Sequence, residues 1–225
     1  MTLRTNARVA GLTFLLYIAF AFPAMVLFGK ATRGEETPAK LAALVEHAGD
    51  VRIVILLSVL CGFCALLLAV TLYALTRDVD ADLARFAMLC RVVEGTVTGP
   101  ALLVAVSLAW LAATGRAGRL DPVSGNTLAA FLLQADNLTT LIGSTFFAVG
   151  STVFAWLFLR GRLIPVWLAW LGVIGSALAA LVMPLQLAGL VRGLLTQVIW
   201  LPVAVFEIVL AFRLILKGTA APVPR

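Results

Sequence analysis

Three ionisable residues lie within long apolar stretches, where a charge is costly and therefore informative. Arg91 and Glu94 are three positions apart in one stretch, and Glu207 lies in the last one. A spacing of three places Arg91 and Glu94 on one face of a helix. Each charge near the middle of a membrane costs on the order of 2.5–3.5 kcal/mol. We therefore expect the three side chains to meet.

The face that carries Arg91 and Glu94 continues through small residues. Gly95 and Gly99 form a GxxxG pattern, and Thr98 lies beside it. Small residues let a neighbouring helix approach closely. This pattern predicts that the face points into a helix bundle and that Thr98 borders the charge cluster.

A second polar patch begins the fourth apolar stretch, near its outer end. It consists of Gln134, Asp136 and Asn137, and Arg192 and Arg52 are its expected partners. Because the patch lies where a membrane meets water, a structural role is the simpler interpretation.

The charge cluster supports two interpretations. One arginine cannot neutralise two carboxylates, so one carboxyl group could keep its proton and serve a proton-coupled carrier. Alternatively, the charges form a pair that fixes how the helices pack. We favour the second interpretation.

Residues for enzymatic, metal or cofactor chemistry are sparse. His47 is the single histidine, and Cys61 and Cys64 have CxxC spacing within an apolar stretch, where a thiol is inert. The sequence contains no P-loop, HExxH, nucleophile elbow or dinucleotide fingerprint. We therefore expect no enzyme activity, no catalytic residue, no metal and no cofactor.

Composition sets the class of protein. The 225 residues are 62% hydrophobic and 12% charged, whereas soluble domains are about 45–50% apolar and about 25% charged. The net charge of +6 comes from short loops between apolar stretches, so the membrane explains it and nucleic acid is not an expected partner. The lipid bilayer is the expected partner.

Six stretches approach or exceed the ~20 apolar residues that a membrane helix needs. We predict an all-α, polytopic bundle that forms a single domain over residues 1–225. The predicted spans are 9–28, 51–75, 83–113, 138–159, 163–187 and 194–216. Thr37 and Pro38 can begin a short amphipathic helix that ends at Gly49 and lies on the outer membrane surface. The segment 121–126 has turn residues and predicts a second outer loop.

Lysine and arginine in the loops predict the orientation. An N-terminus in the cytoplasm places both termini there. The cytoplasmic residues would then be Arg4, Arg8, Arg77, Arg85, Arg160, Arg162, Arg213, Lys217 and Arg225. The outer residues would be Lys30, Arg33, Lys40, Arg52, Arg116, Arg119 and Arg192.

Several short segments, in their order and spacing, resemble the DUF4386 family of bacterial membrane proteins. They are Arg8 to Leu12, Leu44 to His47 before Arg52, Cys90 to Glu94, Leu163 to Gly172, Leu201-Pro202 with Glu207, and Lys217-Gly218. The family typically has arginine after the Ile-Pro pair, where this chain has Val166. The resemblance implies a six-helix protein of the bacterial inner membrane and no particular activity.

We therefore expect a non-enzymatic accessory or regulatory membrane bundle, whose partner is another membrane protein or a second copy of the chain. A small proton-coupled transporter that uses Arg91, Glu94 and Glu207 is the alternative.

Overall fold

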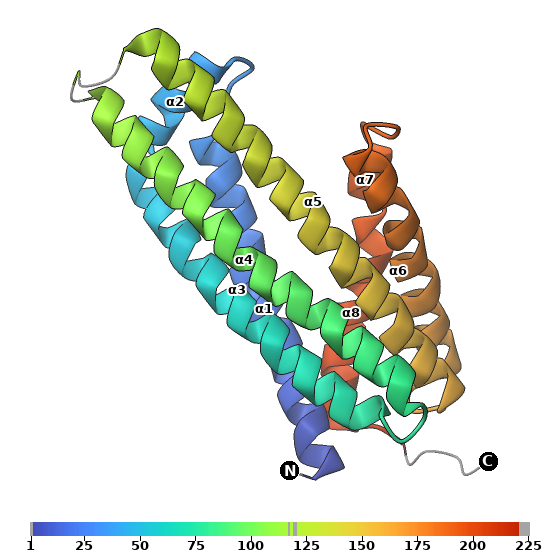
Figure 1. Cartoon of the computed structure of the whole chain (residues 1–225). Helices are drawn as coiled ribbons and strands as arrows, with labels where there is room; N and C mark the ends of the chain where they lie inside the picture. Colours follow the sequence, from blue (N-terminus) through green and yellow to red (C-terminus); the bar gives the residue numbers. More distant parts are fainter. Residues whose placement is uncertain (1, 117, 119–120, 221–225) are drawn as a thin grey trace. The chain divides into compact units, whose positions relative to one another are not determined.

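The computed structural model describes residues 2–116, 118 and 121–220 (Figure 1). Every regular element in these ranges is a helix, which confirms the predicted all-α class. The helices are α1 (Leu3–Ala31), α2 (Thr37–Glu46), α3 (Ala48–Thr76), α4 (Ala81–Arg116), α5 (Pro122–Arg160), α6 (Val166–Leu187), α7 (Leu195–Val198) and α8 (Trp200–Leu216).

Six helical stretches in the described ranges are long and apolar enough to cross a membrane, as predicted. They are α1, α3, α4, α5, α6 and the stretch Leu195–Leu216, which contains α7 and α8. At 1.5 Å per residue, the 36 residues of α4 extend about 54 Å and the 39 residues of α5 about 58 Å. Both helices exceed a hydrocarbon core of about 30 Å, so each must tilt or project beyond it.

Helix α5 begins well before the predicted fourth span. The prediction of a loop over residues 121–126 is wrong, because α5 starts at Pro122. Asp121 caps the helix: its Oδ2 accepts hydrogen bonds from the Ser124 backbone N–H at 2.9 Å and from the Ser124 hydroxyl at 3.0 Å. Both bonds lower the pKa of the Asp121 carboxyl, and the bond from the backbone N–H has the larger effect. Turn residues and a capped, proline-initiated helix look alike in sequence.

The short helix α2 is present, but its ends differ from the prediction. Glu36 rather than Thr37 occupies the cap position, and Gly49 lies inside α3 instead of ending α2. Leu44 is 1% exposed and packs with Ala31 and other apolar residues. The apolar face of α2 therefore contacts protein.

The chain divides into two compact units, each of which is described by itself. The first unit comprises Met1–Tyr17, Phe63–Thr96 and Leu141–Arg225, and the second comprises Ile18–Gly62 and Val97–Thr140. Four helices contribute residues to both units. A single domain over the whole chain stays a prediction.

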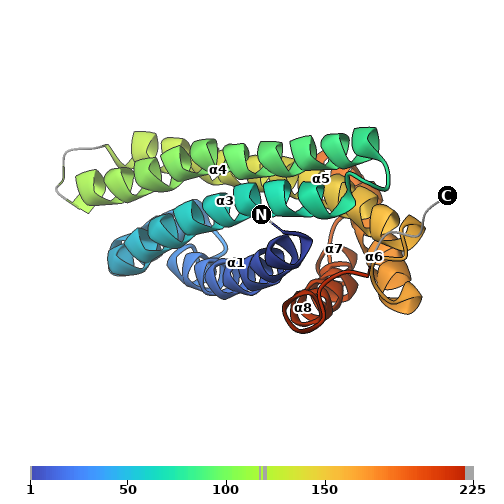
Figure 2. The ribbon, with the colours of Figure 1, turned by 90° about the horizontal axis from the view of Figure 1, so that it is seen from below.

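Close helix contacts organise the first unit. A Cβ at Gly11 of α1 would lie 2.6 Å from the carbonyl oxygen of Ala211 in α8, so only glycine fits there. A Cβ at Gly172 of α6 would lie 2.5 Å from the ring of Phe206 in α8. Figure 2 shows α8 beside α6 and beside the start of α1. The core of this unit is formed by large apolar side chains, among them Leu68, Phe154, Phe158 and Leu210.

The second unit has its own small core. Leu44 of α2, Val51 of α3 and Leu108 of α4 are each at most 1% exposed and pack together. The side chain of His47, which links α2 and α3, is only 13% exposed, and its Nδ1 lies 3.4 Å from Asp50 Oδ2. His47 is therefore largely shielded from solvent.

Candidate functional site

Arg91 is the centre of a charge cluster in the first unit. It lies in α4, its residue exposure is 0%, and it is among the largest fully buried side chains. Its Nη1 donates a hydrogen bond to Glu94 Oε2 at 2.8 Å. Glu94 is 8% exposed. The ion pair predicted from the spacing of three residues is therefore present, and it is shielded from solvent.

Two aromatic residues from other helices complete the surroundings of this pair. The hydroxyl of Tyr17, in α1, donates a hydrogen bond to Glu94 Oε1 at 2.9 Å. The guanidinium carbon of Arg91 lies 4.7 Å from the centre of the Phe147 ring, in α5, which is cation–π geometry. Neither residue was predicted from the sequence. A tyrosine within an apolar helix needs a hydrogen-bond partner and gives some signal, whereas nothing distinguishes Phe147 among 13 phenylalanines.

A glycine in α5 allows this helix to approach the cluster. A Cβ at Gly150 would lie 3.1 Å from the Cβ of Cys90, 3.2 Å from the Ala87 oxygen and 3.5 Å from Cγ of Arg91. The small residue at this contact therefore belongs to α5 and not to the predicted GxxxG pattern of α4.

The GxxxG prediction is wrong at its second glycine. Gly95 is buried, but Gly99 is exposed, and no heavy atom lies within 4 Å of the position that a Cβ would take there. Thr98 is half-buried and belongs to the second unit, whereas Arg91 and Glu94 belong to the first. The role predicted for Thr98 stays a prediction.

Glu207 brings α8 to the cluster. Its exposure is 6%, and it is close enough to interact electrostatically with both Arg91 and Glu94. No residue in the described part of the chain donates a hydrogen bond to its carboxylate. Within the same part, Nε and Nη2 of Arg91 also lack hydrogen-bond partners.

A small cavity lies against Glu207. Its other lining residues are Ser151, Leu72, Leu210 and the aromatic residues Phe14, Phe154, Phe158 and Phe206. Its volume is about 10 Å³, which is about the space that one water molecule requires. The arrangement can therefore hold a water molecule beside a carboxylate, but it has no room for a metabolite.

One of the two ion pairs expected at the second predicted patch, the pair with Arg52, is absent from the described ranges. Asp136 is half-buried, whereas Gln134 and Asn137 are exposed, and all three lie inside α5 rather than at its start. Arg52 belongs to the same unit but makes no ion pair with Asp136 in the described ranges. Arg192 is exposed and belongs to the first unit, so its pairing with Asp136 stays a prediction.

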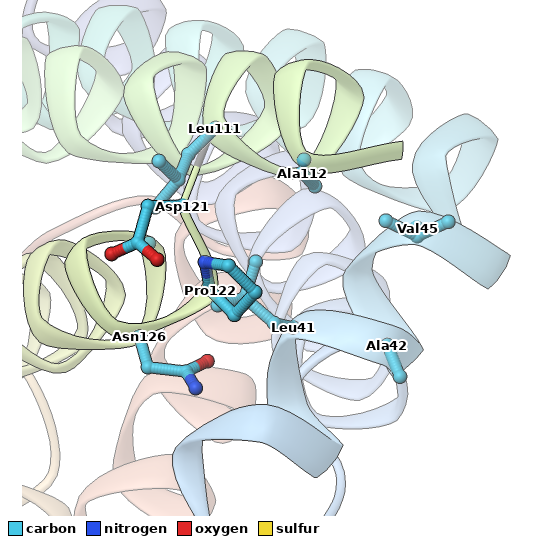
Figure 3. Close-up of a pocket in the computed structure, with 10 residues that line it drawn as sticks. Leu41, Ala42, Val45, Leu111, Ala112, Asp121, Pro122 and Asn126 are labelled. Atoms are coloured by element: carbon cyan, nitrogen blue, oxygen red, sulfur yellow. The ribbon is translucent and has the colours of Figure 1, made fainter. Parts of the chain in front are cut away.

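A larger pocket lies in the second unit, where the sequence predicted no site. It has a volume of about 360 Å³ and lies between α2, the end of α4 and the start of α5 (Figure 3). Most of its lining is apolar, as with Leu41, Val45 and Leu111, and Asp121 and Asn126 add polar groups. In the described ranges no cluster of three metal-ligating side chains occurs.

Comparison with known proteins identifies a matching family. The family model described as "Domain of unknown function (DUF4386)" matches residues 9–218, which confirms the resemblance found in the sequence. Neither the curated proteins nor the solved structures contain a match.

Proposed function

We propose that this chain, which belongs to the DUF4386 family, is a non-enzymatic accessory or regulatory protein of the bacterial inner membrane. It would cross the membrane six times and have both termini in the cytoplasm. Its partner would be another membrane protein or a second copy of the chain. The six apolar helices support the membrane location.

This proposal rests on the observation that the charge cluster is shielded from solvent. The side chains of Arg91 and Glu94 are 1% and 8% exposed, and the cavity beside Glu207 is about 10 Å³. A catalytic or transport site needs access for its substrate, whereas a buried pair of this kind fixes how helices pack. The cluster then joins α1, α4, α5 and α8 into a rigid platform on which a partner can bind.

Purification in a mild detergent tests the accessory role. The full chain is expressed at low level, purified and analysed by native mass spectrometry. We expect a discrete assembly with a fixed ratio of chains, which contains a second membrane protein or another copy. A lone monomer that moves a solute across liposome membranes would contradict the proposal.

The proposed orientation has its own test. An alkaline phosphatase fused after Arg225 is active only outside the cytoplasm, so we expect the fusion to be inactive. The same enzyme inserted after Gly34, in the segment between α1 and α2, should be active. An active fusion after Arg225 and an inactive insertion after Gly34 would indicate the opposite orientation.

A proton-coupled transporter is the second candidate, and one observation favours it. The cluster has one guanidinium for two carboxylates, and Glu207 lies beside a cavity of the size of one water molecule. A proton exchanged at Glu207 would change the charge balance of the cluster. Glu207→Gln keeps the size of the side chain but removes this exchange. If the folded variant keeps every pH-dependent activity of the protein, the transporter candidate is wrong.

A further inference from the structure

Three basic side chains gather at one end of the first unit. Arg162 lies in the connection between α5 and α6, Arg213 lies in the last turn of α8, and Lys217 follows that helix. The backbone N–H of Ala220 donates a hydrogen bond to the Leu163 oxygen at 3.0 Å, which ties the segment after α8 to this connection. Figure 1 shows the end of α8 and the start of α6 at the same end of the unit.

A side-chain contact holds one of these residues in place. Nη1 of Arg213 donates a hydrogen bond to the Gly218 oxygen at 3.0 Å. Gly218 adjoins Lys217, and Leu163 adjoins Arg162, so the side-chain contact and the backbone contact hold the three residues at one end of the unit; we call them the loop cluster. Arg162 and Lys217 are exposed, and Arg213 is half-buried.

Some other basic residues near this end have acidic partners. Arg160 Nη1 lies 2.7 Å from Asp80 Oδ2, and Arg85 Nη1 lies 2.9 Å from Asp82 Oδ1. Asp80 also accepts a hydrogen bond from the Leu83 N–H. This hydrogen bond is the main reason why the pKa of the Asp80 carboxyl is lowered, and Arg160 lowers it further.

Arg162, Arg213 and Lys217 differ from these neighbours. In the described part of the chain none of the three forms an ion pair with a carboxylate. The loop cluster therefore has an excess of positive charge that no ion pair among the described residues balances, and two of its three cations are open to solvent.

We propose that Arg162, Arg213 and Lys217 bind the headgroup of an anionic phospholipid. Arginine presents a planar set of donors that matches phosphate oxygens, and lysine adds a point charge. The first turns of α6 expose Trp167 and Trp170, which are 62% and 46% exposed. Tryptophan is enriched where a membrane meets water, so these rings place the loop cluster at headgroup depth.

This inference does not depend on the accessory role or on the orientation, because it rests on charge and on position at the membrane surface. A free phosphate ion would satisfy the same donors but would not use the membrane position. We therefore assign the site to a lipid.

The test compares two doubly substituted chains. Arg162→Gln/Lys217→Gln removes two cations from the loop cluster and keeps the Arg213 contact. Arg52→Gln/Arg192→Gln removes two other exposed arginines and serves as the matched control. The full chain in neutral detergent is titrated with phosphatidylglycerol, and the rise of the thermal unfolding midpoint gives the apparent affinity. Each lysine or arginine near a membrane surface strengthens binding about fivefold, so the loss of two should weaken the affinity for phosphatidylglycerol about thirty-fold. The control should retain the affinity of the unchanged chain.

Three results would overturn the proposal. Equal loss in the control would show that only total charge matters. An equal rise with phosphatidylcholine would show that no anionic headgroup is selected, and an equal rise with inorganic phosphate would show that no lipid is needed. If the double variant does not elute as folded protein, the single variants Arg162→Gln and Lys217→Gln replace it, each with about a fivefold expected loss.

Discussion

Replacing Arg91 with methionine tests the stabilising role of the charge cluster. Arg91→Met keeps a long, flexible side chain but removes the bond to Glu94 at 2.8 Å and the stacking on Phe147 at 4.7 Å. Two carboxylates, those of Glu94 and Glu207, would then remain buried without a cation. Removing one partner of a buried pair typically costs about 3–5 kcal/mol. We expect a loss of that size in the free energy of unfolding, which is a large part of the ~5–15 kcal/mol that stabilises a domain.

A double-mutant cycle separates the ion pair from general packing. Unfolding is followed by helix content during titration of mixed micelles with a denaturing detergent. The variants are Arg91→Met, Glu94→Gln and the combination of both. Because the combined variant no longer buries an unpaired Glu94, its loss should be smaller than the sum of the single losses by up to about 3 kcal/mol. Strictly additive losses would refute the claim that the two charges stabilise each other.

Four further substitutions probe the helix contacts, the loops and the hydrogen bond of the cluster. Gly11→Ala should destabilise the protein by roughly 1–3 kcal/mol, because the added Cβ would lie 2.6 Å from a backbone oxygen. Gly29→Ala, where the space is open, should instead stabilise α1 by up to about 1 kcal/mol, and the same unfolding titration measures both. Tyr17→Phe should cost about 1.5–3 kcal/mol, since a buried carboxylate loses a donor. A hydrogen bond from the Leu83 N–H lowers the pKa of Asp80 in the folded protein. The ionised Asp80 carboxylate therefore stabilises the folded protein at neutral pH, and this contribution is lost as the pH falls through the lowered pKa. Asp80→Asn should reduce the unfolding midpoint at pH 7 and have no effect in strong acid; an equal effect at both would contradict this.

The number of spans could be predicted from sequence because a membrane helix requires a continuous apolar stretch of sufficient length. The helix ends could not be predicted in the same way. A helix continues through polar residues once a cap satisfies its first N–H groups, as Asp121 does at the start of α5. Hydropathy therefore located the apolar part of α5 at residues 138–159 and missed its first part.

The candidate site shows the same division between local and tertiary information. The pairing of Arg91 with Glu94 follows from helix geometry alone, and the cost of buried charge brought Glu207 into the prediction. Tyr17 and Phe147 come from helices whose approach depends on packing, and no local pattern specifies it. Whether Gly99 or Gly150 makes the close helix contact near Arg91 also depends on which helix packs against α4.

Proton movement in liposomes tests the central claim, that the cluster is closed and structural, most directly. The full chain is reconstituted with a pH-sensitive dye trapped inside, and an imposed pH gradient is followed over time. Liposomes that contain the unchanged chain should lose the gradient no faster than liposomes that contain Glu207→Gln. Faster loss with the unchanged chain, abolished by Glu207→Gln in folded protein, would contradict the account.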